Sequence, residues 1–205
     1  MESLSDKLNN IPEVEFLESR FKFINNVDLR TNLSISFQYV IFLITIEEEI
    51  ELQGPVSYSI FKNIILNTAA IVEGALHHLL KQLIEDKRID PEKILTKEDK
   101  YSNKKILYTT EDGTEICGIH IKKVPAKLRP NTNFQEINRA CKRAELLSDE
   151  FFGEVEELRE KRNKIHLAGL KKEDDLFGKR DIQNAFKTAK KVLDLVEDRL
   201  ENGEK

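Results

Sequence analysis

Apolar residues recur three or four positions apart along most of this chain, which is the spacing of amphipathic helices. The pattern predicts a first helix from about Pro12 to Ile24. A second helix is expected from Asp28, a residue type favoured at helix N-caps, to about Leu52. The run 35–46 of that helix is apolar on most sides, which indicates a central helix or one at an interface. A buried strand is the alternative for the same run.

Longer stripes follow in the rest of the chain. A third helix is expected from about Pro55 to Asp86, with the stripe Phe61, Ile65, Ala69, Val72, Leu76, Leu79 and Leu83. Two further stripes are Phe134, Ile137, Ala140 or Cys141, Ala144 and Leu147, and then Phe151, Val155, Leu158 and Ile165. Ser148 or Asp149 is expected to cap the second of these, and Gly169 to end it. A last helix is predicted by Ile182, Phe186, Ala189, Leu193, Val196 and Leu200.

The period changes to two in the middle of the chain. Residues 104–110 and 115–124 flank Asp112-Gly113, and this arrangement predicts a β-hairpin with a tight turn. Ile116, Gly118, His120 and Lys122 should point to one face, and Cys117, Ile119, Ile121 and Lys123 to the other.

The fold class predicted from these patterns is mainly α. We expect a four- to five-helix bundle with a β-hairpin inserted at about 104–124. The whole chain, 1–205, is expected to be one domain. Its parts would be N-terminal helices over 1–54, a core over 55–86 and 132–202, and the hairpin insertion over 103–125.

Composition narrows the class of protein. The chain is 40% hydrophobic and 34% charged, which allows a packed core with a well-solvated surface. Cys117 and Cys141 have no metal-ligand spacing and are expected to be reduced thiols. The most apolar stretch, Val40–Ile46, is short for a bilayer and is followed by three glutamates. With no recognisable leader segment, we expect a cytoplasmic protein without a membrane contact.

Positive charge gathers in one segment although the net charge is −4. Between Gly118 and Ala144 the only acid is Glu136, against seven basic residues: Lys122, Lys123, Lys127, Arg129, Arg139, Lys142 and Arg143. Such a local excess can bind the phosphates of RNA even on an acidic protein. An ordinary solvated surface is the alternative.

The stretch Leu158–Leu167, LREKRNKIHL, carries the candidate chemistry. Arg159 and His166 are seven residues apart and therefore nearly superposed on a helix surface. Arg162 falls inside the apolar stripe, where a charge needs a partner because burying it alone is costly. Glu73 is a similarly isolated acid in the third helix, so we expect it to contact Arg162 or Arg159 within the same chain.

This stretch resembles the signature of the HEPN superfamily, in which an Arg precedes a His late in a helical bundle. The helix NTAAIVEGALHHLL, which includes Glu73, is similar to the helix that packs beside the motif in that family. The resemblance covers residues 55–83 and 134–200, but neither the hairpin nor the N-terminal helices. It implies a homodimer formed through the motif helices and, in many members, a metal-independent RNase. Many relatives are toxins or defence components, which implies a cognate antitoxin or regulator as a further partner.

The resemblance implies roles for five residues. The catalytic candidates are Arg159, Arg162, Asn163, His166 and Glu73, with no cofactor and no metal. A His titrates near neutrality and can move a proton, whereas Arg binds phosphate oxygens bidentately. The family spacing of four to six intervening residues nominates Arg159, and the Asn that often follows the motif Arg nominates Arg162. A non-catalytic HEPN dimer that binds a partner or a nucleotide is the alternative function. A plain helical interaction protein with an accidental motif is a third.

Overall fold

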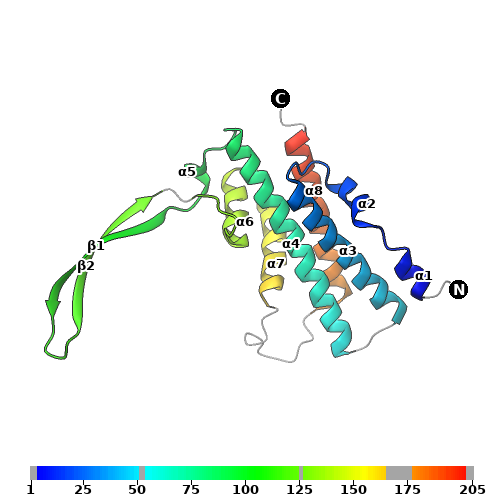
Figure 1. Cartoon of the computed structure of the whole chain (residues 1–205), viewed down its shortest axis with the longest axis horizontal. Coiled ribbons are helices and arrows are strands. Elements are labelled where there is room, and N and C mark those ends of the chain that lie inside the picture. Colours follow the sequence, from blue (N-terminus) through cyan, green and yellow to red (C-terminus); the bar gives the residue numbers. More distant parts are fainter. Residues whose placement is uncertain (1–3, 51–53, 125–126, 165–176, 202–205) are drawn as a thin grey trace.

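The computed structural model describes residues 4–50, 54–124, 127–164 and 177–201. Within these ranges the chain is mainly helical, with one two-stranded antiparallel hairpin, as predicted (Figure 1). The long helices are α3 (Val27–Ile50), α4 (Pro55–Glu85), α6 (Phe134–Arg143), α7 (Asp149–Asn163) and α8 (Lys179–Glu201). The short ones are α1 (Leu4–Asn9), α2 (Val14–Glu18) and α5 (Pro91–Ile94). The strands are β1 (Glu98–Thr109) and β2 (Glu115–Val124).

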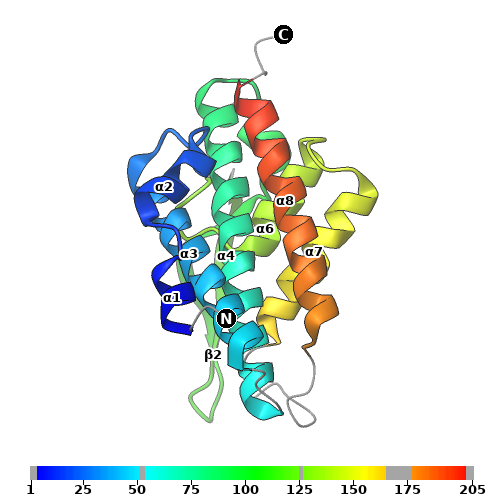
Figure 2. The same cartoon turned by 90° about the vertical axis from the view of Figure 1, so that its right-hand side faces the viewer.

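Helix α4 is the centre of the bundle. It packs against α3, α6, α7 and α8, and it runs through the middle of the molecule in Figure 2. All seven residues of its predicted stripe are buried, because a helix surrounded by four others must be apolar over most of its circumference. Pro55 at its first turn suits the fixed φ of proline.

The run 35–46 is helical and not a strand. Helix α3 buries Leu33, Val40 and Leu43 against α4 and leaves Ile35, Tyr39 and Phe42 exposed on its outer side. The run therefore lies at the edge of the bundle, and the prediction of a central position was wrong. The other possibility in that prediction, a helix at an interface, depends on what covers the exposed outer side of α3, and it stays a prediction.

The first predicted helix is interrupted. Residues from Pro12 to Ile24 form the short α2 and a 3₁₀ turn over Ser19–Phe21. Phe21 is buried and packs edge-on against Phe37 of α3, with ring centroids 6.1 Å apart. This contact draws the chain onto α3 and takes precedence over the continuation of a regular helix.

Helices α3 and α4 are long and apolar enough to cross a membrane by length and composition alone. In α4 56% of the most apolar window is buried, compared with 22% in α3. The candidate span covers the whole of α3, Val27–Ile50, and is therefore longer than the apolar run Val40–Ile46 that the sequence singled out. Core helices of soluble proteins pass the same test, and the cytoplasmic location stays a prediction.

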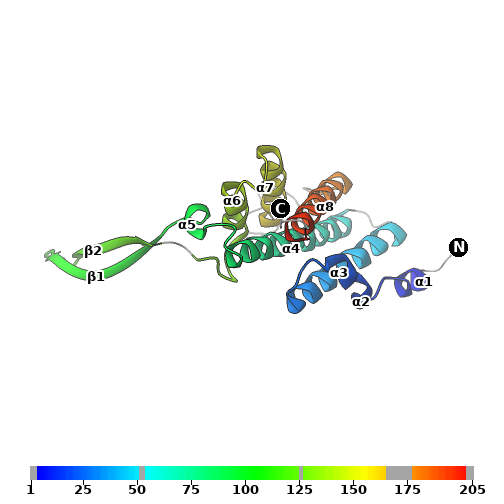
Figure 3. The same ribbon diagram turned by 90° about the horizontal axis from the view of Figure 1, so that it is seen from above.

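The hairpin leaves the bundle beside α5 and projects away from it, as Figures 1 and 3 show. Its strands pack mainly on each other. β2 spans the predicted residues, and β1 begins six residues earlier than predicted, because pairing continues down to Glu98 opposite Val124. Two irregularities interrupt the register, between Ser102 and Lys105 and between Ile106 and Tyr108. Gly113 takes a positive φ of 85° in the turn, which glycine adopts without strain.

Candidate functional site

Glu73 and Arg162 form an ion pair between α4 and α7. The distance from Nη2 of Arg162 to Oε2 of Glu73 is 3.1 Å, and the side chains are 33% and 22% exposed for Arg162 and Glu73 respectively. The predicted contact is thus confirmed, and Arg162 is the arginine that makes it. Burial raises the pKa of Glu73 by more than the charge of Arg162 lowers it. Because one third of its side chain is exposed, Arg162 keeps access to water.

Arg159 has a different carboxylate. Its Nε and Nη2 both donate to Oε1 of Glu156, at 3.0 and 2.6 Å, and its side chain is only 13% exposed. The other oxygen of Glu156 accepts a hydrogen bond from Asn138 at 3.0 Å. The hydrogen bond from Arg159 is the largest cause of the lowered pKa of Glu156. Arg159 is therefore held against its own helix and against α6.

The end of α7 lies at the border of the described residues. Asn163 is exposed, and Lys164 closes the helix with backbone hydrogen bonds to the last turn. His166 lies outside the described residues, as do Ile165 and Gly169. The predicted stacking of Arg159 and His166 stays a prediction. Ser148, one of the two predicted caps, begins α7 by accepting a hydrogen bond from the amide of Phe151.

Two of the seven basic candidates are engaged in contacts within the fold. Arg143 donates to the carbonyl of Ile94 at 2.6 Å, to Glu136 and to Thr96, so it ties the segment after α5 to α6. Lys142 pairs with Asp149 at the start of α7. These contacts occupy the two cations, whereas Arg139 is exposed beside Glu156.

The hairpin sorts its lysines onto two faces. Lys122 lies directly opposite Lys100, and two like charges in cross-strand register repel each other. Lys123 lies opposite Asp99 on the other face, where the charges offset each other. Lys100 and Lys122 thus form a site that a polyanion would stabilise.

A cleft of about 910 Å³ lies between the base of the hairpin and α4. It is bordered by the basic residues Lys81, Lys100, Lys127 and Arg129, and by apolar residues that include Leu29, Ile84, Leu128 and Pro130. Glu85 and Glu92 are its acidic members. Lys127 and Arg129, predicted from the sequence as a linear cluster, are thereby brought together with cations from α4 and β1.

His77 connects this cleft to the ion pair, which the sequence did not indicate. Its Nε2 lies 2.8 Å from the carbonyl oxygen of Arg129. Because a carbonyl only accepts, Nε2 must carry the proton. His77 lies one helical turn after Glu73, and the electrostatic effect of its ring lowers the pKa of that carboxyl. Through Glu73 and His77, one face of α4 therefore contacts both the end of α7 and the segment that precedes α6. The only signal in the sequence was the i, i+4 spacing of an acid and a histidine.

His78 is the next residue but is buried in the bundle, at 3% exposure. Burial lowers its pKa, so the imidazole is neutral near pH 7. Its Nε2 finds no hydrogen-bond partner within the described residues.

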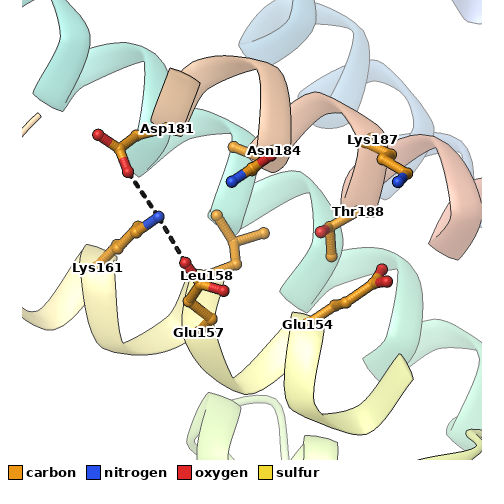
Figure 4. A pocket seen from close by; sticks show the side chains of 9 residues that line it. Glu154, Glu157, Leu158, Lys161, Asp181, Asn184, Lys187 and Thr188 are labelled. Atoms are coloured by element: carbon orange, nitrogen blue, oxygen red, sulfur yellow. Dashed lines mark hydrogen bonds and ion pairs between the residues drawn. The ribbon is translucent and has the colours of Figure 1, made fainter. Parts of the chain in front are cut away.

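The side of α7 that faces α8 carries paired charges. A cleft of about 180 Å³ between α7 and α8 is lined by Glu154, Glu157 and Asp181, against Lys161 and Lys187 (Figure 4). Lys161 bridges Glu157 and Asp181 at 2.7 Å each. Lys191 binds both oxygens of Glu154, so the three carboxylates are all paired with lysines and this cleft carries little net charge.

Among the described residues, no group of three or more His, Cys, Asp or Glu side chains is placed to hold a metal ion. Comparisons with family models, with curated proteins and with solved structures find no match to this chain.

Proposed function

We propose that this chain is an RNase-like protein of HEPN type that binds single-stranded RNA and cleaves it without a metal ion. The observation that carries the proposal is the Glu73–Arg162 pair, which supports Arg162 as a cation with one third of its side chain exposed at the end of the motif helix. A planar guanidinium presents two parallel N–H groups to a phosphate. Glu73 fixes one side of Arg162 and leaves the remaining donors for the substrate.

Of the two motif candidates, Arg162 is the phosphate-binding arginine in this proposal. It is the more exposed of the two, 33% against 13%, and Asn163 follows it. Arg159 already donates two hydrogen bonds to Glu156, and both would have to break before it could bind an RNA.

The chemical step proposed is transesterification. His166 takes the proton from a ribose 2′-OH, the 2′ oxygen forms a bond to the adjacent phosphorus, and the P–O5′ bond breaks. The leaving 5′ oxygen takes a proton from solvent water, which gives a 2′,3′-cyclic phosphate and a 5′-OH, and His166 later returns its proton to the solvent. Arg162 stabilises the charge that grows on the phosphate oxygens. The cleft beside His77 and the lysines Lys100 and Lys122 would hold the strand.

The resemblance implies that two copies work together through the motif helices, and a homodimer belongs to the proposal. A toxin or defence role, with an antitoxin or regulator as partner, is the biological setting it suggests.

A cleavage assay in EDTA tests the function. Wild type and His166→Ala are compared on the same single-stranded RNA after removal of contaminating nucleases. Lys164→Ala is the matched control, since it removes an exposed charge beside the motif. The proposal expects cleavage by wild type and Lys164→Ala and none by His166→Ala, whereas equal cleavage by all three would reject it.

A non-catalytic HEPN dimer that binds a partner or nucleotide is the second candidate. The capture of Arg159 by Glu156 favours it, because the arginine at the family spacing is then unavailable to a phosphate. This candidate expects RNA or nucleotide binding that is lost with Arg162, and no cleavage by any variant.

A further inference from the structure

The middle of one hairpin face is apolar, between the Asp99–Lys123 pair at its base and the Thr109–Glu115 pair near its tip. Tyr101 pairs with Ile121 and Ile106 with Cys117, and Ile119 lies between them on the same face. We call these five residues the hairpin apolar face. Tyr101, Ile106, Ile119 and Ile121 are 46–63% exposed although they are large hydrophobic side chains. A two-stranded hairpin is marginally stable by itself in water, so a strip of this kind on a projecting arm calls for a cover.

A second uncovered strip lies on α3. Ile35, Tyr39 and Phe42 are 38–48% exposed and share one side of the helix, and we call them the α3 stripe. The rings of Tyr39 and Phe42 stack with centroids 6.2 Å apart, which makes a flat apolar surface. The two strips have similar lengths, roughly 13 Å from Ile121 to Cys117 and roughly 11 Å from Ile35 to Phe42.

We propose that the hairpin apolar face docks on the α3 stripe of a second copy of this chain, and that the exchange is reciprocal. The hairpin points away from its own bundle, as Figures 1 and 3 show, so the two strips of one chain do not face each other. In a reciprocal pair, each copy supplies one hairpin and one stripe, and both strips of both copies are covered.

The buried area favours a second copy over an unrelated partner. From their exposed fractions, the residues of the two strips together expose at most on the order of 700 Å² per chain, close to the roughly 800 Å² that each partner buries in a stable complex. A foreign partner on one strip would bury only part of this area and would leave the other strip in water.

Acidic charges near the strips favour one orientation. On the docking face the base of the hairpin carries Asp99 and Lys123, which offset each other, whereas the tip is acidic through Glu111, Asp112 and Glu115. On α3, Asp28 and Arg30 offset each other near the start, whereas Glu47, Glu48 and Glu49 lie near the end, where Lys179 and Lys7 pair with Glu47 and Glu49. Repulsion between the acidic tip and the acidic end of α3 therefore sets the hairpin base beside the end of α3 and brings Cys117, nearer the tip, towards the start of α3.

This contact is separate from the motif helices, because α4 and α8 lie between α3 and α7 in Figure 2. It leaves Lys100 and Lys122 on the other face of the hairpin. The contact does not depend on RNase activity and can be tested without RNA.

Native Cys117 provides a site-specific probe, since Cys141, the other cysteine, is fully buried. Asn32→Cys and Ile50→Cys place a thiol at the two ends of α3 on one angular position, because 18 residues make five turns. Gln183→Cys on α8 is an exposed control away from the stripe. The three full-length variants are oxidised mildly, and the linked peptides are identified by mass spectrometry.

The proposal expects an interchain disulfide between Cys117 and the new thiol in Asn32→Cys, at least about tenfold more than in Ile50→Cys or Gln183→Cys. Ile121→Glu should abolish this link and lower the assembly's mass in light scattering, with unchanged circular dichroism. Preferential linkage at position 50, Cys117–Cys117 linkage alone, or linkage no greater than in the Gln183→Cys control would overturn the proposal. A monomer that floats with lipid vesicles through the α3 stripe would also overturn it, in favour of a membrane.

Discussion

Nη2 of Arg162 lies 3.1 Å from Oε2 of Glu73, and this ion pair fastens the end of α7 to the middle of α4. Both charged side chains lie on otherwise apolar helix faces, and each provides the opposite charge that compensates the partial burial of the other. One turn further along α4, His77 holds the carbonyl of Arg129. The pair therefore marks the place where the proposed chemical and strand-binding parts of the molecule meet.

The first prediction concerns the stability contributed by the pair. Glu73→Ala should lower the free energy of unfolding by about 1–2 kcal/mol, because Arg162 loses its acceptor but can still reach water. Removing one partner of a fully buried pair costs more, about 3–5 kcal/mol. Glu73→Gln is the matched variant and should cost less, since its amide oxygen still accepts from Arg162. Denaturant unfolding at pH 7 measures both, and a larger loss for the Gln variant would contradict this account.

The second prediction follows from the raised pKa of Glu73. The folded state holds the Glu73 proton more tightly than the unfolded state, so wild type should lose stability relative to Glu73→Gln as the pH rises through the interval above 4.5. Below that interval the carboxyl is protonated in both states, and its favourable contribution is complete. The difference in free energy of unfolding between the two proteins at pH 4 and pH 7 checks the sign. If wild type instead became more stable relative to Glu73→Gln as the pH rises, the charge of Arg162 would lower the pKa of Glu73 by more than burial raises it.

The third prediction separates the two arginines. Arg162→Ala should reduce RNA cleavage by at least about 100-fold, the usual cost of removing a donor to a developing oxyanion. Arg159→Ala should reduce cleavage by less than about tenfold, because Arg159 is already bound to Glu156. Initial rates under saturating RNA measure the difference, with circular dichroism as the control for folding. The reverse order of effects would assign the motif to Arg159.

The fourth prediction concerns the strand-binding face. Lys100→Ala with Lys122→Ala should weaken RNA binding and reduce the salt slope of the affinity by about 1 for each lysine. Lys123→Ala, opposite Asp99, and Lys142→Ala, paired with Asp149, are the controls and should change the affinity much less. Titrations at several salt concentrations give the slopes. Equal effects from all four lysines would indicate general charge attraction instead of a defined face.

Arg143 and Lys142 give the fifth prediction. Arg143→Ala should destabilise the fold by about 1–2 kcal/mol, because it frees the carbonyl of Ile94 and the Glu136 carboxylate that Arg143 holds. Lys142→Ala should cost less than Arg143→Ala, since Asp149 is almost fully exposed. Thermal unfolding of the two variants tests the contrast, which fails if Lys142→Ala is the more damaging.

Much of the helical fold could be predicted because strong periodicity and burial coincide in α4. Its stripe from Phe61 to Leu83 repeats over more than six turns, and every member is buried. The Glu73–Arg162 contact was also predictable, since each residue is an unusual charge on an apolar face. In α3 the same periodicity identified the helix but not its place, because apolar residues cover both its buried and its exposed sides.

The rest depended on contacts that periodicity does not encode. The break after Glu18 comes from the packing of Phe21 on Phe37, which is a tertiary effect. The contact of His77 with Arg129 spans 52 residues and involves a backbone carbonyl, so no side-chain pattern marks it. Glu156 and Arg159 have ordinary i, i+3 spacing, and nothing in the sequence distinguishes this pair from neighbouring charges.

The most direct test of the central claim is the chemistry of the RNA ends. An end-labelled single-stranded RNA that contains one 2′-deoxyribose is incubated with wild type and with His166→Ala in EDTA, and the products are mapped. The account predicts metal-independent cuts that leave 2′,3′-cyclic phosphates, spare the linkage after the deoxyribose, and fall by at least about 100-fold in His166→Ala. Equal cleavage by both proteins, cleavage at the deoxyribose, or no cleavage by wild type across varied RNAs would contradict it.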